Sequence, residues 1–229
     1  MGREKVTFDS ENKAGKCEGV LQGDFSQTKK GLIVLQEWLG YTKQIQNEAE
    51  EIGNLGKFIT LVPDLYRGKL ATDNEEAGHL MNNLEFGPAP LPISGGAAKF
   101  LLSKGCTSVG VTGFCMGGAL AMASAALGVR DLRRQQPFYG IPGASLADVS
   151  KIKIPVQGHF GEKDELEGFS SPKDVKALEE KFKSGGVQYE LFNYPAGHAF
   201  TTPQVPNYNA DCCKTAFGRL VEFMNKNLK

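Results

Sequence analysis

Residues 108–118 read SVGVTGFCMGG and place a short apolar run directly before a turn that carries Cys115 among glycines. An apolar run of this length, bounded by glycine, is typical of a strand covered on both faces, and we expect one over 108–112. The alanine-rich segment 119–127 follows and predicts a helix that lies close to the sheet. Strand, tight turn and helix in this order favour a parallel sheet, in which reactive side chains gather at the carboxyl ends of the strands.

The remainder of the chain alternates short apolar runs with helical patterns. We expect further strands over residues 18–21, 31–36, 58–62, 136–139, 154–160 and 187–193. We expect helices over 42–56, 171–183 and 209–227, and one or two more within 73–104, broken by a Pro- and Gly-rich loop at 87–96. This alternation predicts an α/β protein with a doubly wound, mostly parallel sheet flanked by helices. No repeat or linker divides the sequence, so we expect a single domain over residues 1–229.

The charges of the chain balance, with 26 Lys and Arg residues against 26 Asp and Glu residues. Nucleic acid and anionic membranes attract proteins with a basic surplus, so neither is an expected partner. The sequence contains no signal-peptide stretch and no apolar window of membrane-spanning length. Its five cysteines are an odd number without metal-ligand spacing, which favours free thiols in a reducing compartment. We therefore expect a cytoplasmic protein.

The turn at residues 113–117, GFCMG, fits the G-x-nucleophile-x-G elbow with cysteine in the usual serine position. Glycines flank the nucleophile because larger side chains there would collide with the turn or with the neighbouring strand. The turn aims the Cys115 thiol at the N-terminus of the next helix, whose free N–H groups favour a thiolate. The backbone N–H of Met116 then becomes a donor for an oxyanion. The alternative is that Cys115 is a small buried apolar residue in a glycine-rich turn.

A carboxylate and a histidine follow later strands in the order that this elbow chemistry requires. Asp164 comes after the strand at 154–160 and His198 after the strand at 187–193, at the same edge of the sheet as Cys115. A thiolate mechanism needs an imidazole to take and return the proton and a carboxylate to fix the imidazole tautomer. We therefore expect a triad of Cys115, Asp164 and His198, with Glu162 and Glu165 as alternative acids.

Four segments resemble the dienelactone hydrolase family, whose members are also called carboxymethylenebutenolidases. They are QEWLG at 36–40, GFCMGG at 113–118, FGEKD at 160–164 and GHAF at 197–200. The resemblance extends over residues 31–229 and is closer to the eukaryotic-type members. It implies the α/β-hydrolase fold without a separate cap domain. It also implies a hydrolase of small esters or lactones that forms a thioester on Cys115.

The resemblance gives further residues specific roles. In such enzymes a buried glutamate pairs with the resting thiol, is displaced when substrate binds, and takes the thiol proton, and this role would belong to Glu37. The arrangement spares the thiol from oxidation between turnovers. The backbone N–H of Trp38 would be the second oxyanion donor. Tyr139, Phe114 and Arg67 are the side chains expected in the substrate pocket.

The sequence also departs from the bacterial enzymes that open dienelactones. Those enzymes have a serine directly after the histidine and an arginine three residues further on, which engage the substrate carboxylate. Ala199 and Thr202 stand in these places here. Hydrolysis of an ester or lactone therefore follows from the resemblance, and hydrolysis of dienelactone itself does not.

We expect a small-molecule ester or lactone as the reaction partner, no metal or organic cofactor, and a monomer or weak homodimer. Two alternatives stay open on the sequence: a hydrolase that acts on glycosidic or peptide bonds, and a redox or non-catalytic thiol protein. A redox role would require a resolving cysteine, and Cys106, the nearest one, precedes the strand that Cys115 follows. The segment 84–96 either shapes the pocket or only connects two elements over the surface.

Overall fold

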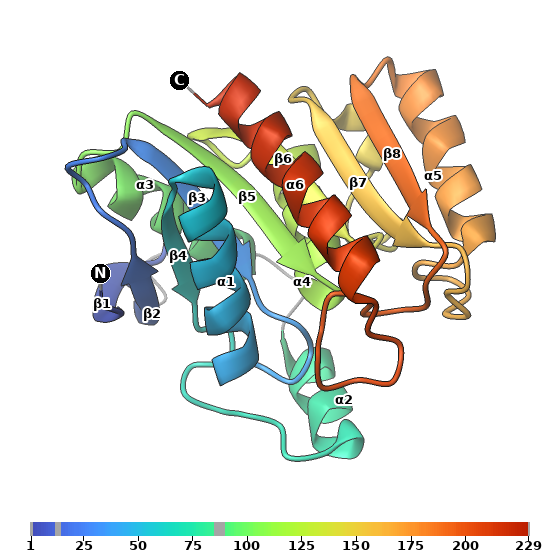
Figure 1. The fold of residues 1–229 in the computed structure, drawn as a ribbon, viewed down its shortest axis with the longest axis horizontal. Helices are drawn as coiled ribbons and strands as arrows, with labels where there is room; N and C mark the ends of the chain where they lie inside the picture. The colour runs from blue at the N-terminus through green and yellow to red at the C-terminus, as the bar shows by residue number, and fades with distance from the viewer. Residues whose placement is uncertain (1, 12–14, 85–89, 229) are drawn as a thin grey trace.

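An eight-stranded sheet forms the centre of the part of the chain that the structure describes, residues 2–11, 15–84 and 90–228 of a computed structural model (Figure 1). The strands are β1 (Glu4–Asp9), β2 (Lys16–Gln22), β3 (Lys30–Leu35), β4 (Ile59–Pro63), β5 (Ser108–Phe114), β6 (Leu132–Phe138), β7 (Val156–Gly161) and β8 (Tyr189–Tyr194). They lie in the order β1-β2-β4-β3-β5-β6-β7-β8. From β4 to β8 in this order all neighbouring strands are parallel, while β1 pairs antiparallel with β2 and β2 pairs antiparallel with β4. The predicted mostly parallel sheet is confirmed.

Helices cover both faces of this sheet, as the sequence predicts. One face carries α1 (Lys43–Gly56) and α6 (Ala210–Asn227), and the other carries α3 (Pro90–Ser103), α4 (Met116–Ala126) and α5 (Pro172–Gly185) (Figure 1). A short 3₁₀ helix, η1 (Val149–Lys151), contacts α4 and α5. The remaining helix, α2 (Asn74–Asn83), lies beyond the sheet, past the arrowhead of β5 (Figure 1). No helix within the described ranges has both the length and the apolar character needed to cross a bilayer.

The central strand β3 shows why the apolar runs are continuous. Leu32 and Val34 pack in the core on the α1 and α6 face, while Ile33 and Leu35 pack in the core on the α3 and α4 face. All four side chains are 0% exposed. Successive strand residues point to opposite faces, so a strand covered on both sides must be apolar at every position.

Three helices begin where side-chain caps predict. Thr42 accepts a hydrogen bond from the backbone of α1, and Asn209 does the same for α6. Ser171 and Asp174 form a capping box at the start of α5, with Pro172 in the first turn. These caps satisfy backbone N–H groups that have no partner inside the helix, and they fix the helix starts to within a residue or two of the prediction.

Three expectations need correction. The edge strand β1 lies outside the predicted strands, because most of its side chains are exposed and it has no continuous apolar run. Helix α4 begins at Met116, three residues earlier than the alanine-rich pattern suggests, since the elbow leads directly into it. The loop expected at 87–96 is helical from residue 90, because buried Ile93, Ala97 and Leu101 recur at helical spacing. Residues 87–89 of that loop lie outside the described residues.

His159 is a fully buried histidine near the carboxyl end of β7. Its ring stacks on Phe138, with centroids 4.5 Å apart and planes inclined by 18°. Its Nδ1 lies 2.8 Å from the Tyr194 hydroxyl, and its Nε2 lies 2.6 Å from the amide nitrogen of Gln136. Burial, with a smaller effect from the positive charge of Arg219, lowers the pKa of His159 from 6.5 to about 3. The folded protein therefore holds this ring neutral.

This histidine is expected to destabilise the protein in mild acid. The unfolded chain binds the proton near pH 6.5 and the folded chain only near pH 3, so the free energy of unfolding falls as the pH decreases between these values. Between pH 6.5 and 4.5 the loss is roughly 2–3 kcal/mol. Urea unfolding of the wild type and His159→Phe measures it, and His79→Gln, at an exposed histidine, is the control. Equal pH slopes for the wild type and His159→Phe would contradict this account.

Candidate active site

The elbow at Cys115 joins the last residue of β5 to the first residue of α4. Cys115 has φ 53° and ψ −117°, a strained conformation for a residue with a side chain. A Cβ on Gly113 would lie 2.3 Å from the carbonyl oxygen of Gly117, and a Cβ on Gly117 would lie 2.3 Å from that of Leu35. Both neighbours are backbone atoms that cannot rotate away. The glycine spacing thus allows the turn to pass against β3, as the motif predicts.

The surroundings of the Cys115 sulfur keep it protonated in the absence of substrate. Burial, and after it the charge of Glu37, raise the pKa of the Cys115 thiol far above its ordinary value. The backbone N–H groups of Met116 and Trp38 point at the sulfur and lower the pKa by less. Two backbone N–H donors thus lie beside the Cys115 sulfur, which is where an oxyanion hole would require them.

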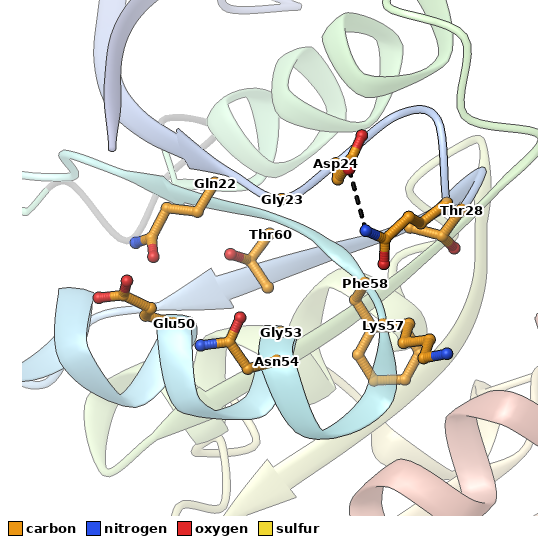
Figure 2. Close-up of a pocket in the computed structure, with 11 residues that line it drawn as sticks. Gln22, Gly23, Asp24, Thr28, Glu50, Gly53, Asn54, Lys57, Phe58 and Thr60 are labelled. Atoms are coloured by element: carbon orange, nitrogen blue, oxygen red, sulfur yellow. Dashed lines mark hydrogen bonds between the residues drawn. The ribbon is translucent and has the colours of Figure 1, made fainter. Parts of the chain in front are cut away.

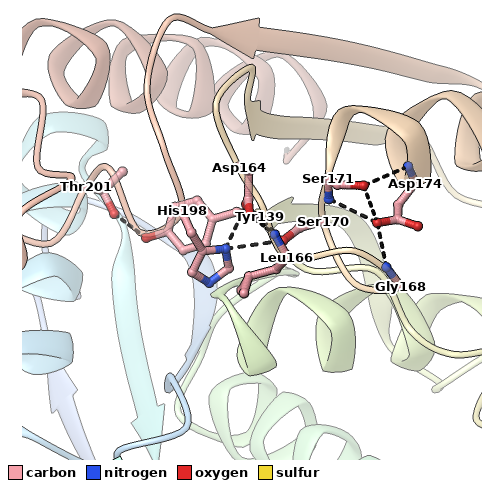
Figure 3. A network of polar contacts seen from close by, with 9 residues as sticks. All are labelled: Tyr139, Asp164, Leu166, Gly168, Ser170, Ser171, Asp174, His198 and Thr201. Atoms are coloured by element: carbon pink, nitrogen blue, oxygen red, sulfur yellow. Dashed lines mark hydrogen bonds and ion pairs between the residues drawn. The ribbon is translucent and has the colours of Figure 1, made fainter.

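His198 and Asp164 meet at the same edge of the sheet (Figure 3). The Nδ1 atom of His198 lies 2.7 Å from Asp164 Oδ2, and Asp164 is only 2% exposed. Asp164 also accepts hydrogen bonds from the Ser170 hydroxyl at 2.9 Å and from the backbone of Leu166 at 3.0 Å. With Nδ1 bound to the carboxylate, Nε2 is the nitrogen free to accept a proton, and it has no hydrogen-bond partner among the described residues.

The alternative acids lie away from the histidine. Glu162 and Glu165 are exposed, although they lie within two residues of Asp164. Asp164 alone of the three carboxylates turns inward to His198, because its backbone lies in the tight turn after β7.

Aromatic rings hold the imidazole of His198 in place. The Tyr139 ring meets it edge-on at a centroid distance of 5.0 Å, and the Phe169 ring lies 6.1 Å away. Tyr139 follows the end of β6 with φ 36° and is 0% exposed. Its side chain supports the histidine from within the core, rather than lining an open pocket as expected.

Glu37 lies two residues beyond the end of β3, among the same groups. Thr202 donates a hydrogen bond of 3.3 Å to Glu37 Oε1. Burial raises the pKa of Glu37, while the neighbouring His198 and the hydroxyls of Thr202 and Tyr139 lower it by less. The carboxyl group therefore lies within electrostatic reach of both the thiol and the imidazole.

Two hydroxyl residues at the site escaped the sequence reasoning. The Tyr66 hydroxyl lies 2.8 Å from the carbonyl oxygen of Trp38 and 3.3 Å from the sulfur of Met116, so it braces both residues whose N–H groups face Cys115. Ser170 bridges Asp164 and His198 Nδ1, at 2.9 and 3.2 Å. Tyr66 is adjacent to Arg67 in the sequence DLYRGK, but no spacing rule distinguishes it, and Ser170 has no local signal at all.

The structure also corrects the other two expected pocket residues, Phe114 and Arg67. Phe114 is 0% exposed and packs against Phe138 and Phe217 on the α6 face, so its ring belongs to the core. Arg67 points away from the elbow, because its guanidinium donates a hydrogen bond of 3.2 Å to the carbonyl oxygen of Lys16 in β2. β2 lies three positions from β5 in the sheet.

A separate hollow of about 170 Å³ lies between the C-terminal half of α1 and the loop after β2 (Figure 2). Gln22, Asp24, Asn54 and Thr60 are among the residues that line it. Thr60 is the second residue of β4, so this hollow lies at the amino ends of the parallel strands. Reacting groups of such sheets gather at the carboxyl ends, so the hollow is not part of the candidate active site.

The described residues contain no group of three or more His, Cys, Asp or Glu side chains that could hold a metal ion. The site thus consists of a thiol, an imidazole, two carboxyl groups and converging N–H donors. Such a set can carry out nucleophilic attack on a carbonyl, with proton transfer by the imidazole.

Comparison with known proteins relates the chain to hydrolases. Residues 17–228 match the model of the dienelactone hydrolase family. Protein usf of Aquifex pyrophilus is 30% identical over 207 residues, which cover 86% of this chain and 88% of that protein. A putative carboxymethylenebutenolidase of Aquifex aeolicus is 30% identical over 177 residues, 74% of this chain and 75% of its own. A dienelactone hydrolase-like promiscuous phosphotriesterase from metagenomic libraries superposes over 100% of both chains with a TM-score of 0.83 and 20% identity, which shows the shared fold.

Proposed function

The chain belongs to the dienelactone hydrolase family and is a carboxylic ester or lactone hydrolase, and on this premise we propose that Cys115 is its nucleophile. The observation that carries the proposal is the 2.7 Å contact between His198 Nδ1 and Asp164. It leaves His198 Nε2 as the proton acceptor on the edge of the sheet where the elbow presents the thiol.

Glu37 is proposed to gate this nucleophile. Its charge disfavours ionisation of Cys115, so the thiol rests in its protonated form and resists oxidation. A substrate that enters beside the thiol displaces the Glu37 carboxylate, which then takes the thiol proton. Glu37 passes this proton to His198 Nε2, and the Cys115 thiolate, paired with the imidazolium, attacks the carbonyl carbon.

The remaining steps use groups that already surround the sulfur. The oxygen of the tetrahedral intermediate accepts hydrogen bonds from the N–H groups of Trp38 and Met116. Collapse of the intermediate breaks the bond to the alkoxide, which leaves as the alcohol with a proton from the imidazole. A water molecule then gives a proton to His198 Nε2 and attacks the thioester. The bond between carbon and sulfur breaks, the carboxylic acid leaves, and the imidazolium returns the proton to the thiolate, which restores the free thiol.

A small ester or lactone without a charged group beside the reacting carbonyl is the proposed substrate. Ala199 is apolar, and Thr202 is hydrogen-bonded to Glu37, so neither offers a cation to a substrate carboxylate. Arg67 is bound to the carbonyl oxygen of Lys16. The Aquifex aeolicus relative is named a putative carboxymethylenebutenolidase, and the butenolide ring in that name supports a lactone as the class of substrate.

Trapping the acyl-enzyme tests the proposal. After brief mixing with p-nitrophenyl acetate and an acid quench, the wild type is expected to carry one acetyl group on the peptide that contains Cys115. Cys115→Ala is expected to carry none, because the thioester cannot form, and Cys212→Ala, at a cysteine away from the elbow, should behave like the wild type. Peptide mass spectrometry measures the label. An acetyl group on another residue during turnover, or undiminished turnover by Cys115→Ala, would contradict the proposal.

The redox and glycosidase alternatives from the sequence find less support. Cys106 precedes β5 and Cys115 follows it, so a seven-residue strand of roughly 23 Å separates the two thiols, too far for a resolving cysteine. A glycosidase needs two carboxyl groups free to face one glycosidic bond. Asp164 is bound to His198 and 2% exposed, so it is not free in this way.

A further inference from the structure

A chain of polar side chains leads from Glu37 to a buried glutamate, Glu48, on α1. The Tyr139 hydroxyl lies 2.6 Å from Thr201 Oγ1 (Figure 3). The same hydroxyl is close enough to the Glu37 carboxyl to lower its pKa. Thr201 Oγ1 donates a hydrogen bond of 3.2 Å to Glu48 Oε1 when that carboxyl is ionised, and accepts one when it is protonated. The exposures of the inner three side chains are 0% for Tyr139, 1% for Thr201 and 3% for Glu48. Two buried hydroxyls therefore connect two carboxyl groups.

Each hydroxyl has a single hydrogen to donate, so this chain has two self-consistent arrangements. In one, a protonated Glu48 donates to the threonine, the threonine to the tyrosine, and the tyrosine to an ionised Glu37. In the other, every hydrogen bond is reversed, Glu37 holds the proton and Glu48 is ionised. The geometry points to Glu37 and Glu48 sharing one proton through the two hydroxyls, with Glu48 holding it in the resting enzyme.

The surroundings of Glu48 disfavour a charge. Its Oε2 is buried and has no hydrogen-bond partner among the described residues, which is costly for a carboxylate. Burial raises the pKa of Glu48 well above its ordinary value, and the charges of Glu37 and Glu51 raise it further. The side chains of Gln44 and Thr201 offset only part of this.

The groups that face the two carboxyls from other elements agree with this distribution. From α6, the buried thiol of Cys213 faces Glu48 and is neutral, because burial raises its pKa to about 12. Lys214 lines the groove between α1 and α6 but is exposed to solvent. His198, in contrast, faces Glu37 and lowers its pKa. The negative charge of the pair is therefore stabilised at Glu37.

A groove between α1 and α6 lies beside the Glu48 end of these linked side chains. It has a volume of about 720 Å³, and both Glu48 and Thr201 border it. Transfer of the shared proton from Glu48 to Glu37 conserves the number of protons and the charge. One proton leaves Glu48, each hydroxyl passes on its own hydrogen, and one proton arrives at Glu37, while the negative charge moves from Glu37 to Glu48.

The consequence for catalysis rests on the proposed gating role of Glu37. Glu37 can accept the thiol proton of Cys115 only while it is ionised. By holding the shared proton, Glu48 keeps Glu37 ionised and able to do so. Glu48 is therefore a positioning residue that acts through Glu37 and does not touch the substrate.

Carbon-13 NMR of the glutamate carboxyl groups tests the shared proton directly. The signals of Glu37 and Glu48 are assigned with Glu37→Gln and Glu48→Gln. In the wild type at pH 7 we expect Glu48 to be protonated and Glu37 to be ionised. In Glu37→Gln we expect the titration midpoint of Glu48 to fall by roughly one pH unit or more, since the charge that repels its own is gone. An ionised Glu48 at pH 7 in the wild type, or an unmoved midpoint in Glu37→Gln, would overturn the proposal.

Two further variants separate transfer through the hydroxyls from simple repulsion. Thr201→Val keeps the shape of the side chain and removes its hydroxyl, so in this background Glu37→Gln is expected to move the Glu48 midpoint by less than half as much. A full shift in that background would show repulsion through space and overturn the role of Thr201. Glu51→Gln removes an exposed carboxylate on the same helix and is expected to move Glu48 much less than Glu37→Gln does.

Gln44→Lys tests the consequence for activity. A lysine beside Glu48 is expected to favour its ionised form, to send the proton to Glu37, and to move the acid side of the pH profile of kcat/KM upward by roughly one pH unit. Gln44→Met removes the amide without adding a charge and is the control. An unchanged profile together with the NMR shifts would overturn the catalytic role of the shared proton. Absence of esterase activity in the wild type would contradict the proposed function instead, and the NMR titration would still decide whether the proton is shared.

Discussion

Replacing His198 by alanine is expected to lower kcat/KM for p-nitrophenyl acetate by about a thousandfold or more. The imidazole pairs with the Cys115 thiolate, protonates the leaving alkoxide and deprotonates the attacking water, so its loss slows both halves of the reaction. His79→Ala, at an exposed histidine of α2, is the matched control and should keep wild-type activity. Steady-state kinetics with circular dichroism as a check of folding measures the effect, and activity within tenfold of the wild type would argue against this assignment.

Asp164→Asn should show the same defect for a different reason. The asparagine keeps the shape of the side chain, but its amide can donate to His198 Nδ1 and favour the wrong imidazole tautomer, at a cost of about a hundredfold to ten-thousandfold in kcat. Glu162→Gln and Glu165→Gln change the neighbouring exposed carboxylates and should leave kcat unchanged. If either control variant matched Asp164→Asn, the acid of the site would have to be reassigned.

Gly117→Ala is expected to destabilise the protein by about 3 kcal/mol or more and to lower activity about a hundredfold. Its Cβ would lie 2.3 Å from the carbonyl oxygen of Leu35 and 2.6 Å from that of Gln36. Relief of these contacts must push α4 away from β3. This movement separates the Met116 N–H, at the start of α4, from the Trp38 N–H, just beyond β3, so the two donors no longer converge on Cys115.

Gly78→Ala is the matched control for this substitution. A Cβ at Gly78, within α2, would meet no atom within 4 Å. Alanine favours a helix over glycine by about 1 kcal/mol, so this variant should be as stable as the wild type or more so. Chemical unfolding of both variants measures the difference. Equal stabilities would show that the elbow has room for a side chain and that the glycine spacing is not steric in origin.

The sequence predicted the features that depend on neighbours along the chain. Apolar runs such as 31–36 indicate strands covered on both faces, and the caps at Thr42 and Ser171 mark helix starts. The family resemblance and the carboxylic ester or lactone hydrolase function are confirmed by the match over residues 17–228. The single domain, the cytoplasmic location and the monomer or weak homodimer stay predictions.

The sequence alone also predicts the glycine spacing of the elbow and the order Cys115, Asp164, His198. A parallel sheet brings the carboxyl ends of its strands to one edge, so residues that follow these strands are expected to meet there. The sequence does not determine which carboxylate of FGEKDE turns toward His198, because adjacent residues of a loop point in different directions. The ion pair depends on how the loop after β7 folds against the loop after β8, since Asp164 and His198 are 34 positions apart in the sequence.

Only the tertiary structure determined which hydroxyl and buried carboxyl groups surround the site. Thr202 lies 165 residues from its partner Glu37, and Thr201 lies 153 residues from Glu48. Glu48 reads locally as one of several acidic residues of a solvated helix, yet packing of α1 beside α6 leaves it 3% exposed. Arg67 and Phe114 show the reverse case, since both lie near site residues in the sequence and point elsewhere. Side-chain direction follows from packing between distant segments, and the pattern of a single segment does not contain it.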